Sequence, residues 1–170
     1  SFSVSLWTSF TNGTGDPAFI GNKDWRSGGN QGWAIATAGN GRLQWNLGDG
    51  DAGGRSRRDY DGPGGTLNSG AWHHIATVFD RLQGVALTYL DGTAVSTNSI
   101  SGDLDSIDTA AGLAVNIGQD GLGAYTDNGA VGLRDGRIDD VAVWRRSLGA
   151  AEVQTIFQRG QQGLNLFGMT

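Results

Sequence analysis

Residues 21–33, GNKDWRSGGNQGW, combine the chain's single lysine with one aspartate, two tryptophans and four glycines. An aromatic ring offers an apolar face on which a sugar ring can stack, while amide and carboxylate neighbours can bond the sugar hydroxyls. We expect Trp25 and Trp33 to line such a surface. Lys23 or Arg26 would then reach an acidic group on the ligand. The alternative is that one or both tryptophans fold back as a lid on the core.

A second polar stretch, GDGDAGGRSRRDYDG at residues 48–62, places arginines beside a tyrosine and four aspartates. Arg57 and Arg58, together with Tyr60, form a candidate clamp for a ligand, because a guanidinium fork bonds carboxylate or sulfate groups with parallel donors. The simpler interpretation, which we favour, is that these arginines pair with aspartates of the same stretch. Such surface ion pairs form readily, although each contributes little free energy.

Two loops carry oxygen ligands of the kind that calcium prefers. Strand residues an even number of positions apart share a face, so Asn22 and Asp24 form one pair. Asn116 and Asp120 form a second pair by the same rule. If the two loops meet, their carboxylates and amides would begin a calcium site of roughly six to eight oxygens. The alternatives are that both aspartates only brace their own turns, or that the aspartates at 103–108 hold the metal.

Groups that could act in catalysis are few. His73 and His74 are adjacent in a predicted strand, so they point to opposite faces and cannot chelate one metal ion together. The single glutamate, Glu152, lies in a predicted helix, where a solvated side chain is the simplest interpretation. The sequence contains no Gly-x-Ser-x-Gly nucleophile motif and no phosphate-binding glycine loop before a helix. We therefore expect no catalytic residues.

The elements that must position these groups are mostly strands. Apolar and polar residues alternate in short segments between glycine and aspartate turns, as is typical of β-strands. Asp91-Gly92 and Asn40-Gly41 are typical of hairpin turns, because their residues tolerate positive φ. In the last segment the alternation puts Asp139 on the face of two valines, so we expect a paired carboxylate pointing to the core. The predicted strands are residues 2–10, 18–23, 32–37, 42–48, 73–80, 85–92, 113–118 and 137–144.

One segment has the periodicity of a helix. Within residues 147–160 an apolar stripe forms on one side, because Val153, Ile156 and Phe157 recur at helical spacing. Ser147 can cap the amino end and Gly160 can end the helix. We expect one short helix at about residues 147–159.

The composition restricts the class of protein. The formal net charge is −5, which argues against a nucleic-acid binder, and the absence of cysteine excludes disulfides. The longest apolar runs have only a few residues, whereas a membrane-spanning helix needs about 20. The 170 residues fit a single domain. The chain begins SFSVSLW, without an initiator methionine or a basic leader, so we expect a segment of a longer protein.

Two specific motifs follow one another along the chain. AWHHIATVFD is soon followed by YLDG, and IDDVAVWRRSLGAAEV comes near the end. With FSVSLW at the start and NIGQDG in between, this order resembles the laminin-G-like branch of the concanavalin A-like lectin and glucanase folds over nearly the whole chain. The resemblance implies an all-β fold, a two-sheet antiparallel jelly-roll sandwich with one short C-terminal helix.

The resemblance also implies a function. Members of this family commonly serve as sugar-binding, adhesion or accessory modules of secreted proteins, and many bind calcium at loop ends. Glucanases of the fold carry a Glu-x-Asp-x-x-Glu strand, which this chain lacks. We therefore expect a non-catalytic, lectin-like carbohydrate-binding module with one calcium ion. Its expected partners are a polysaccharide or glycan and a neighbouring catalytic domain. The alternatives are an adhesion or domain-assembly module without a sugar site and, third, a polysaccharide-active enzyme.

Overall fold

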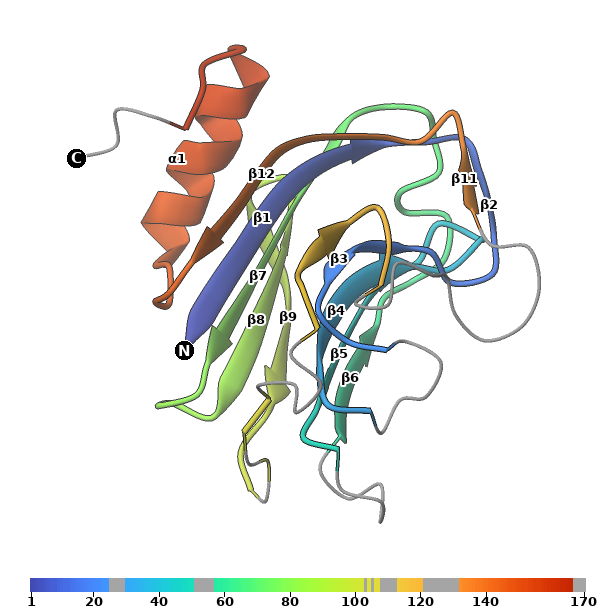
Figure 1. Ribbon diagram of the computed structural model, residues 1–170. Helices are drawn as coiled ribbons and strands as arrows, with labels where there is room; N and C mark the ends of the chain where they lie inside the picture. Colours follow the sequence, from blue (N-terminus) through green and yellow to red (C-terminus); the bar gives the residue numbers. More distant parts are fainter. Residues whose placement is uncertain are drawn as a thin grey trace. The chain divides into compact units, whose positions relative to one another are not determined.

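The computed structural model describes residues 1–24, 30–50, 57–102, 104, 106–107, 113–120 and 132–166. Within these residues the chain forms two five-stranded antiparallel sheets, one two-stranded ladder and one helix (Figure 1). The contacts divide the chain into two compact units, each built around one of the larger sheets. The predicted all-β class with a short C-terminal helix is confirmed, whereas the single-domain boundary at residues 1–170 stays a prediction.

The first unit contains the amino-terminal strand and the helix. It comprises Ser1–Thr8, Trp72–Gly102 and Arg137–Thr170. Its sheet has the strand order β12-β1-β7-β8-β9, so the first strand lies between two strands from much later in the chain. The elements are β1 (Phe2–Ser9), β7 (His73–Asp80), β8 (Val85–Leu90), β9 (Thr93–Ser99), β12 (Arg137–Trp144) and α1 (Ala150–Gln161).

The second unit carries most of the polar loops. It comprises Ser9–Ala71 and Asp103–Gly136, and its sheet has the order β10-β3-β4-β5-β6. A short ladder of β2 and β11 belongs to the same unit. The elements are β2 (Asn12–Thr14), β3 (Ala18–Gly21), β4 (Gly32–Thr37), β5 (Leu43–Gly48), β6 (Arg57–Asp61), β10 (Asn116–Ile117) and β11 (Gly132–Arg134).

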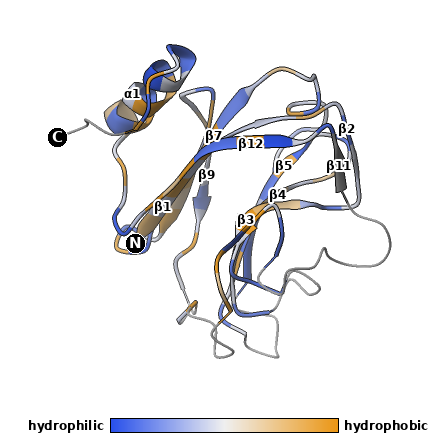
Figure 2. Cartoon of the chain, turned by 45° about the horizontal axis from the view of Figure 1, so that its top comes forward, coloured by the Kyte–Doolittle hydropathy of each residue, from blue (hydrophilic) through white to orange (hydrophobic). Residues whose placement is uncertain are grey.

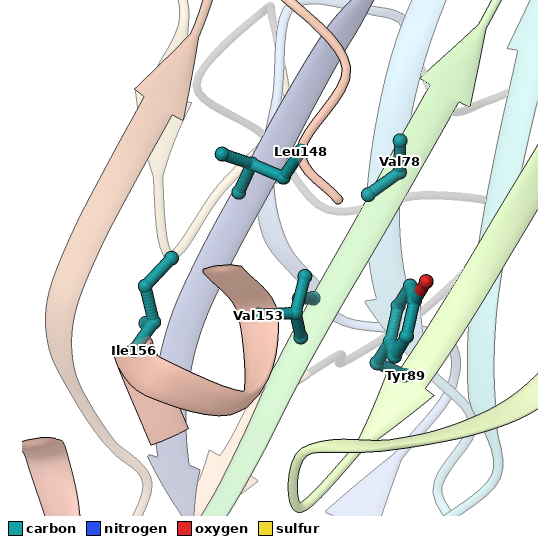
Figure 3. Packing of buried hydrophobic residues seen from close by; sticks show 6 residues of the cluster. Val78, Tyr89, Leu148, Val153 and Ile156 are labelled. Atoms are coloured by element: carbon teal, nitrogen blue, oxygen red, sulfur yellow. The ribbon is translucent and has the colours of Figure 1, made fainter. Parts of the chain in front are cut away.

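Helix α1 packs on one face of the first unit's sheet. The apolar stripe of the helix is buried against strands β7 and β8, because burial of apolar surface is the main driving force for docking an amphipathic helix (Figure 3). In Figure 2 the helix carries both hydrophobic and hydrophilic colours, in agreement with one buried and one solvated side. The cluster consists of Ala76, Val78, Tyr89, Leu148, Val153 and Ile156.

The ends of α1 differ from the prediction. Gly149, not Ser147, is the N-cap, and the Glu152 carboxylate accepts the Gly149 backbone N–H at 2.8 Å. An acidic side chain at the third helical position thus replaces the expected serine cap. The helix also continues through Gly160 to Gln161, because Gly160 serves close packing and not termination.

The strand predictions agree with the structure for the central strands and for the edge strand β12, and they fail at the other margins. β4, β7 and β12 have the predicted bounds, and the Asp91-Gly92 turn has φ angles of 49° and 75°. Residues 113–118 form a strand only at Asn116–Ile117. β2, β6, β9 and β11 were not among the predicted strands.

No helix among the described residues is long and apolar enough to cross a membrane.

Asp139 does not point to the core, and the prediction for it was wrong. Its side chain is exposed, and its carboxylate accepts the backbone N–H of Asp140 at 2.8 Å. Val143, four positions further along β12, is 49% exposed as well, so the face that carries Asp139 is turned to solvent. Trp144, on the other face, packs against the core cluster, so the alternation was read correctly but the wrong face was assigned to the core.

Candidate functional site

Strand β5 has one apolar and one polar face. Along β5, the apolar side chains of Trp45 and Leu47 alternate with those of Gln44 and Asn46. The register pairs Gln44 with Asp61 and Asn46 with Asp59. Directly opposite residues share a face, so the amides of β5 meet the carboxylates of β6. We call these four residues, with Arg57, the polar face.

A chain of hydrogen bonds runs across the polar face. The Lys23 ammonium donates to Oδ1 of Asn46, and Nδ2 of Asn46 donates to Oδ1 of Asp59. Nε of Arg57 donates to Oδ2 of the same carboxylate at 2.5 Å. Charged and neutral donors thus converge on Asp59 from two sides, which holds its carboxylate in one orientation.

The chain of hydrogen bonds is buried at one end and exposed at the other. Lys23 is 0% exposed and Asn46 is 2% exposed. The side chains of Arg57 and Asp59 are 47% and 35% exposed, respectively. At the same exposed edge, Nε2 of Gln44 donates to Oδ1 of Asp61 at 2.6 Å. The solvent-accessible groups of the polar face are therefore at its β6 end.

Lys23 forms the buried end of this chain of hydrogen bonds. Burial lowers the pKa of its ammonium to about 7, although the carboxylates of Asp59 and Asp24 act in the opposite direction. Because the side chain has no exposed surface, it cannot make the predicted direct contact with an acidic group of a ligand. Its role in this arrangement is to orient Asn46, which it reaches directly.

Two of the predicted aromatic residues lie on the apolar face of β5 and its neighbours. Trp33 is 6% exposed and lies opposite Leu47, on the apolar face of the sheet, as the lid alternative anticipated. Tyr60 stacks on the buried Trp45 with ring centroids 6.2 Å apart, also on that face. Trp25 and Arg26 fall outside the described residues.

The two neighbouring arginines of β6 have different environments. Arg57 pairs with Asp59, as the self-pairing interpretation predicts for this stretch. Arg58 lies one position further along the strand, on the opposite face, and Nη1 of its guanidinium donates to the Arg57 carbonyl at 2.9 Å. Of the two predicted clamp residues, the structure therefore brings only Arg57 to the polar face.

The two predicted calcium loops lie side by side. β10 pairs with β3 so that Asn116 is opposite Gly21, the residue before Asn22. Oδ1 of Asn22 accepts the Trp33 N–H at 3.0 Å, and Nδ2 of Asn116 donates to the Asp120 carbonyl at 2.7 Å. Asp120 is 2% exposed.

These contacts leave the metal prediction open. Each amide oxygen has two lone pairs, so the Asn22 oxygen retains one for a cation. The Asp24 backbone carbonyl accepts Nδ2 of Asn30 at 2.9 Å, a contact that does not involve the Asp24 carboxylate. Among the described residues, no three His, Cys, Asp or Glu side chains are grouped as metal ligands. The predicted set has only two carboxylates, so it depends on the amides and calcium stays a prediction.

The histidines and Glu152 have structural partners. Nδ1 of His73 lies 2.9 Å from Oδ2 of Asp91, and Nε2 of His74 lies 2.8 Å from the Ser5 hydroxyl. Arg146 binds Glu152 through both carboxylate oxygens, and this pair lowers the pKa of Glu152 to about 2. A permanently ionised, paired carboxylate on a helix is unsuited to general acid catalysis.

The sequence contained a signal for the polar face that the loop-centred interpretation missed. In RLQWNLG, residues 42–48, the three polar residues fall on one side of a strand whose other side is apolar. Amides on an otherwise regular core strand are unusual and indicate that this side is not plain core. The partner carboxylates of Asp59 and Asp61 could be assigned only from the register.

Residues 1–154 match the family described as the concanavalin A-like lectin/glucanases superfamily. The chain belongs to this superfamily. The match confirms the resemblance read from the order of motifs. Among curated proteins, no relative matches the sequence.

Solved structures share this superfamily fold at low sequence identity. The carbohydrate-binding module CBM40 of the Ruminococcus gnavus IT-sialidase has a TM-score of 0.68 and 11% identity, covering 92% of this chain and 82% of that one. The same module has been solved with α2,3 sialyllactose bound, at a TM-score of 0.67 and 14% identity, covering 92% and 82% of the two chains.

A toxin domain is similar over a smaller share of its own length. The binding domain of Paraclostridial Mosquitocidal Protein 1 has a TM-score of 0.67 and 21% identity, with 92% of this chain and 36% of that chain covered. The present chain thus spans about a third of the length of that domain. At these identities the likeness shows the fold alone, and this fold is of a type found in binding modules.

Proposed function

We propose that this chain is a non-catalytic carbohydrate-binding module that binds its glycan at the exposed edge of the polar face. The observation that carries the proposal is the hydrogen-bonded chain from Lys23 through Asn46 to Asp59 and Arg57. Sugar hydroxyls need fixed donors and acceptors, and this edge offers a guanidinium, carboxylates and an amide in fixed positions. The CBM40 fold of the sialidase supports the same class of function.

The glycan test begins with a glycan array, with and without calcium. Saturable binding of at least one glycan is the expected result, and no binding in either condition would overturn the proposal. The two adjacent arginines then provide a matched pair of variants. Arg57→Ala should weaken binding by about tenfold, as expected for loss of a charge-assisted hydrogen bond.

Arg58→Ala is the control, because Arg58 has the same side chain on the opposite face of β6. It should leave the affinity within about twofold of the parent protein. If Arg58→Ala weakens binding more than Arg57→Ala, the glycan lies on the other face. Thermal unfolding of both variants separates loss of binding from loss of fold.

Calcium is part of this proposal as a cofactor of the neighbouring loops. Asn22, Asp24, Asn116 and Asp120 would supply side-chain oxygens, and backbone carbonyls and water would complete the shell. Support comes from the pairing of β10 with β3, which brings the two loops together. Calorimetric titration of calcium should show one site in the parent protein and lose it in Asp24→Ala. No heat in the parent removes calcium, and equal binding by both proteins moves it elsewhere.

A second candidate function is an adhesion or assembly module without a sugar site. It is favoured by β10, an edge strand of its sheet on which Ile117 is 57% exposed beside Val115 at 49%. Exposed apolar residues on an edge strand can pair with a strand of another chain. A negative glycan array together with binding to a neighbouring domain of the longer protein would favour this candidate.

Secretion and membership of a longer, glycan-active protein are part of the same proposal. A carbohydrate-binding module acts by holding an attached domain near its polymer. The expected readout is that the attached domain releases less product from an insoluble polysaccharide when this chain is deleted. Activity on a short soluble substrate should not change.

A further inference from the structure

A pocket of about 750 Å³ is lined by residues of the first unit, none of which belongs to the polar face. One wall is the carboxyl-terminal part of α1 and the residues that follow it. The other walls come from the ends of β1 and β7, the turn after β8, and the middle of β12. The volume falls in the range of small-molecule sites, which is roughly 300 to 1,000 Å³. The lining residues are Trp7, Trp72, Asp91, Asp139, Asp140, Phe157, Gly160, Gln161, Gly163, Leu164 and Asn165.

The aromatic wall of this pocket is held firmly. Trp7 stacks on Phe157 with ring centroids 5.7 Å apart, and the helix approaches it closely at Gly160. A Cβ atom at Gly160 would come within 2.3 Å of Nε1 of Trp7, so only glycine permits this contact. Trp72 is different, because 42% of its side chain is exposed and its ring is open to a ligand.

The charged wall consists of three carboxylates. Asp91 is occupied by His73 and by the His74 backbone N–H, at 2.9 and 2.8 Å. Asp139 accepts one N–H, from Asp140. Within the described part of the chain, no donor is bonded to the Asp140 carboxylate itself. The left-handed backbone of Asp140 lets two successive strand residues line the same pocket.

This combination selects the charge of the ligand. Among the described lining residues there is no lysine or arginine, so the charged groups of the lining would repel an anion. A bound metal ion does not fit either, because within the described residues no three acidic or histidine side chains converge on one point. An organic cation satisfies both walls, since an ammonium group is attracted to a tryptophan face and to carboxylates.

We propose that the pocket between α1 and the β12-β1-β7-β8-β9 sheet binds an organic ammonium ligand, with Trp72 as the stacking face and Asp140 as the free carboxylate. The site shares no residue with the polar face, so it does not depend on the proposed glycan binding.

The test compares choline with 3,3-dimethylbutan-1-ol, a neutral molecule of the same shape. Titration of the whole chain is followed by tryptophan fluorescence and calorimetry. Choline should bind saturably and at least about tenfold more tightly than the neutral alcohol, and its affinity should fall as salt is added. Equal affinity for the two molecules would show an apolar pocket without charge selection. Absence of saturable choline binding would also overturn the proposal.

Variants locate the binding. Trp72→Ala and Asp140→Asn should each weaken choline binding by about fivefold, the change that about 1 kcal/mol produces. Asparagine tolerates positive φ, so Asp140→Asn removes the charge and keeps the backbone. Asp135→Asn is the matched control, because Asp135 is an exposed aspartate with a φ of 56° outside the pocket. If Asp135→Asn weakens binding as much as Asp140→Asn, the effect is general electrostatics and the site is wrong.

Discussion

His74 is a single buried side chain whose protonation is coupled to folding. Its ring is 0% exposed, it contacts Trp7 and Phe157, and its Nδ1 has no hydrogen-bond partner among the described residues. Burial lowers the pKa of His74 to about 4, and the nearby carboxylate of Asp91 opposes this only in part. The neutral imidazole is therefore the form that the folded protein accommodates.

The expected pH dependence follows from the direction of this shift. Between about pH 6.5 and 4 the unfolded chain binds a proton at His74 that the folded chain does not. Stability is therefore lost as the pH falls through this range, by up to about 1.4 kcal/mol per pH unit from this group. Urea unfolding at a series of pH values measures it.

His74→Phe is the comparison, because phenylalanine fills the ring site and does not titrate. The unfolding free energy of the unmodified protein minus that of His74→Phe should decrease as the pH falls from about 6.5 to 4. Carboxylates titrate in both proteins and cancel in this difference. A difference that does not vary with pH would show that His74 is protonated in the folded state.

Helix α1 depends on contacts at both of its ends. At its start, Arg146 holds Glu152, and Glu152 in turn holds the Gly149 N–H. Near its end, Gly160 lets the helix lie against the Trp7 indole. Alanine normally stabilises a helix relative to glycine by about 1 kcal/mol, so the sign of a substitution at Gly160 reports which effect wins.

Gly160→Ala should destabilise the protein by about 1 to 3 kcal/mol, because its Cβ would overlap a ring that is itself stacked on Phe157. Gly149→Ala is the control at the other end of α1, where the nearest atom to a Cβ is 3.6 Å away. That change should cost well under about 1 kcal/mol. Chemical denaturation of both variants decides, and a stabilised Gly160→Ala protein would show that Trp7 moves freely.

The chain as a whole presents its two proposed sites on different compact units. The polar face belongs to the unit of β3 to β6, and the aromatic and acidic pocket belongs to the unit of β1 and α1. Membership of the superfamily does not by itself predict this division of sites between the two units, because one fold can carry many different sites. The function of this chain is therefore decided by side chains and not by its strand order.

The sequence by itself determined strands such as β4, β7 and β12, the hairpin at Asp91-Gly92 and the single helix, because alternation, helical spacing and turn propensity are properties of consecutive residues. It did not determine which polar groups meet. The register of β5 and β6 brings Asn46 to Asp59. The docking of α1 brings Gly160 to Trp7, which is far away in the sequence. Asp139 was misplaced, because alternation alone does not say which face of β12 is turned to the core. Contacts between distant residues depend on strand register and helix docking, and only the tertiary structure decided them.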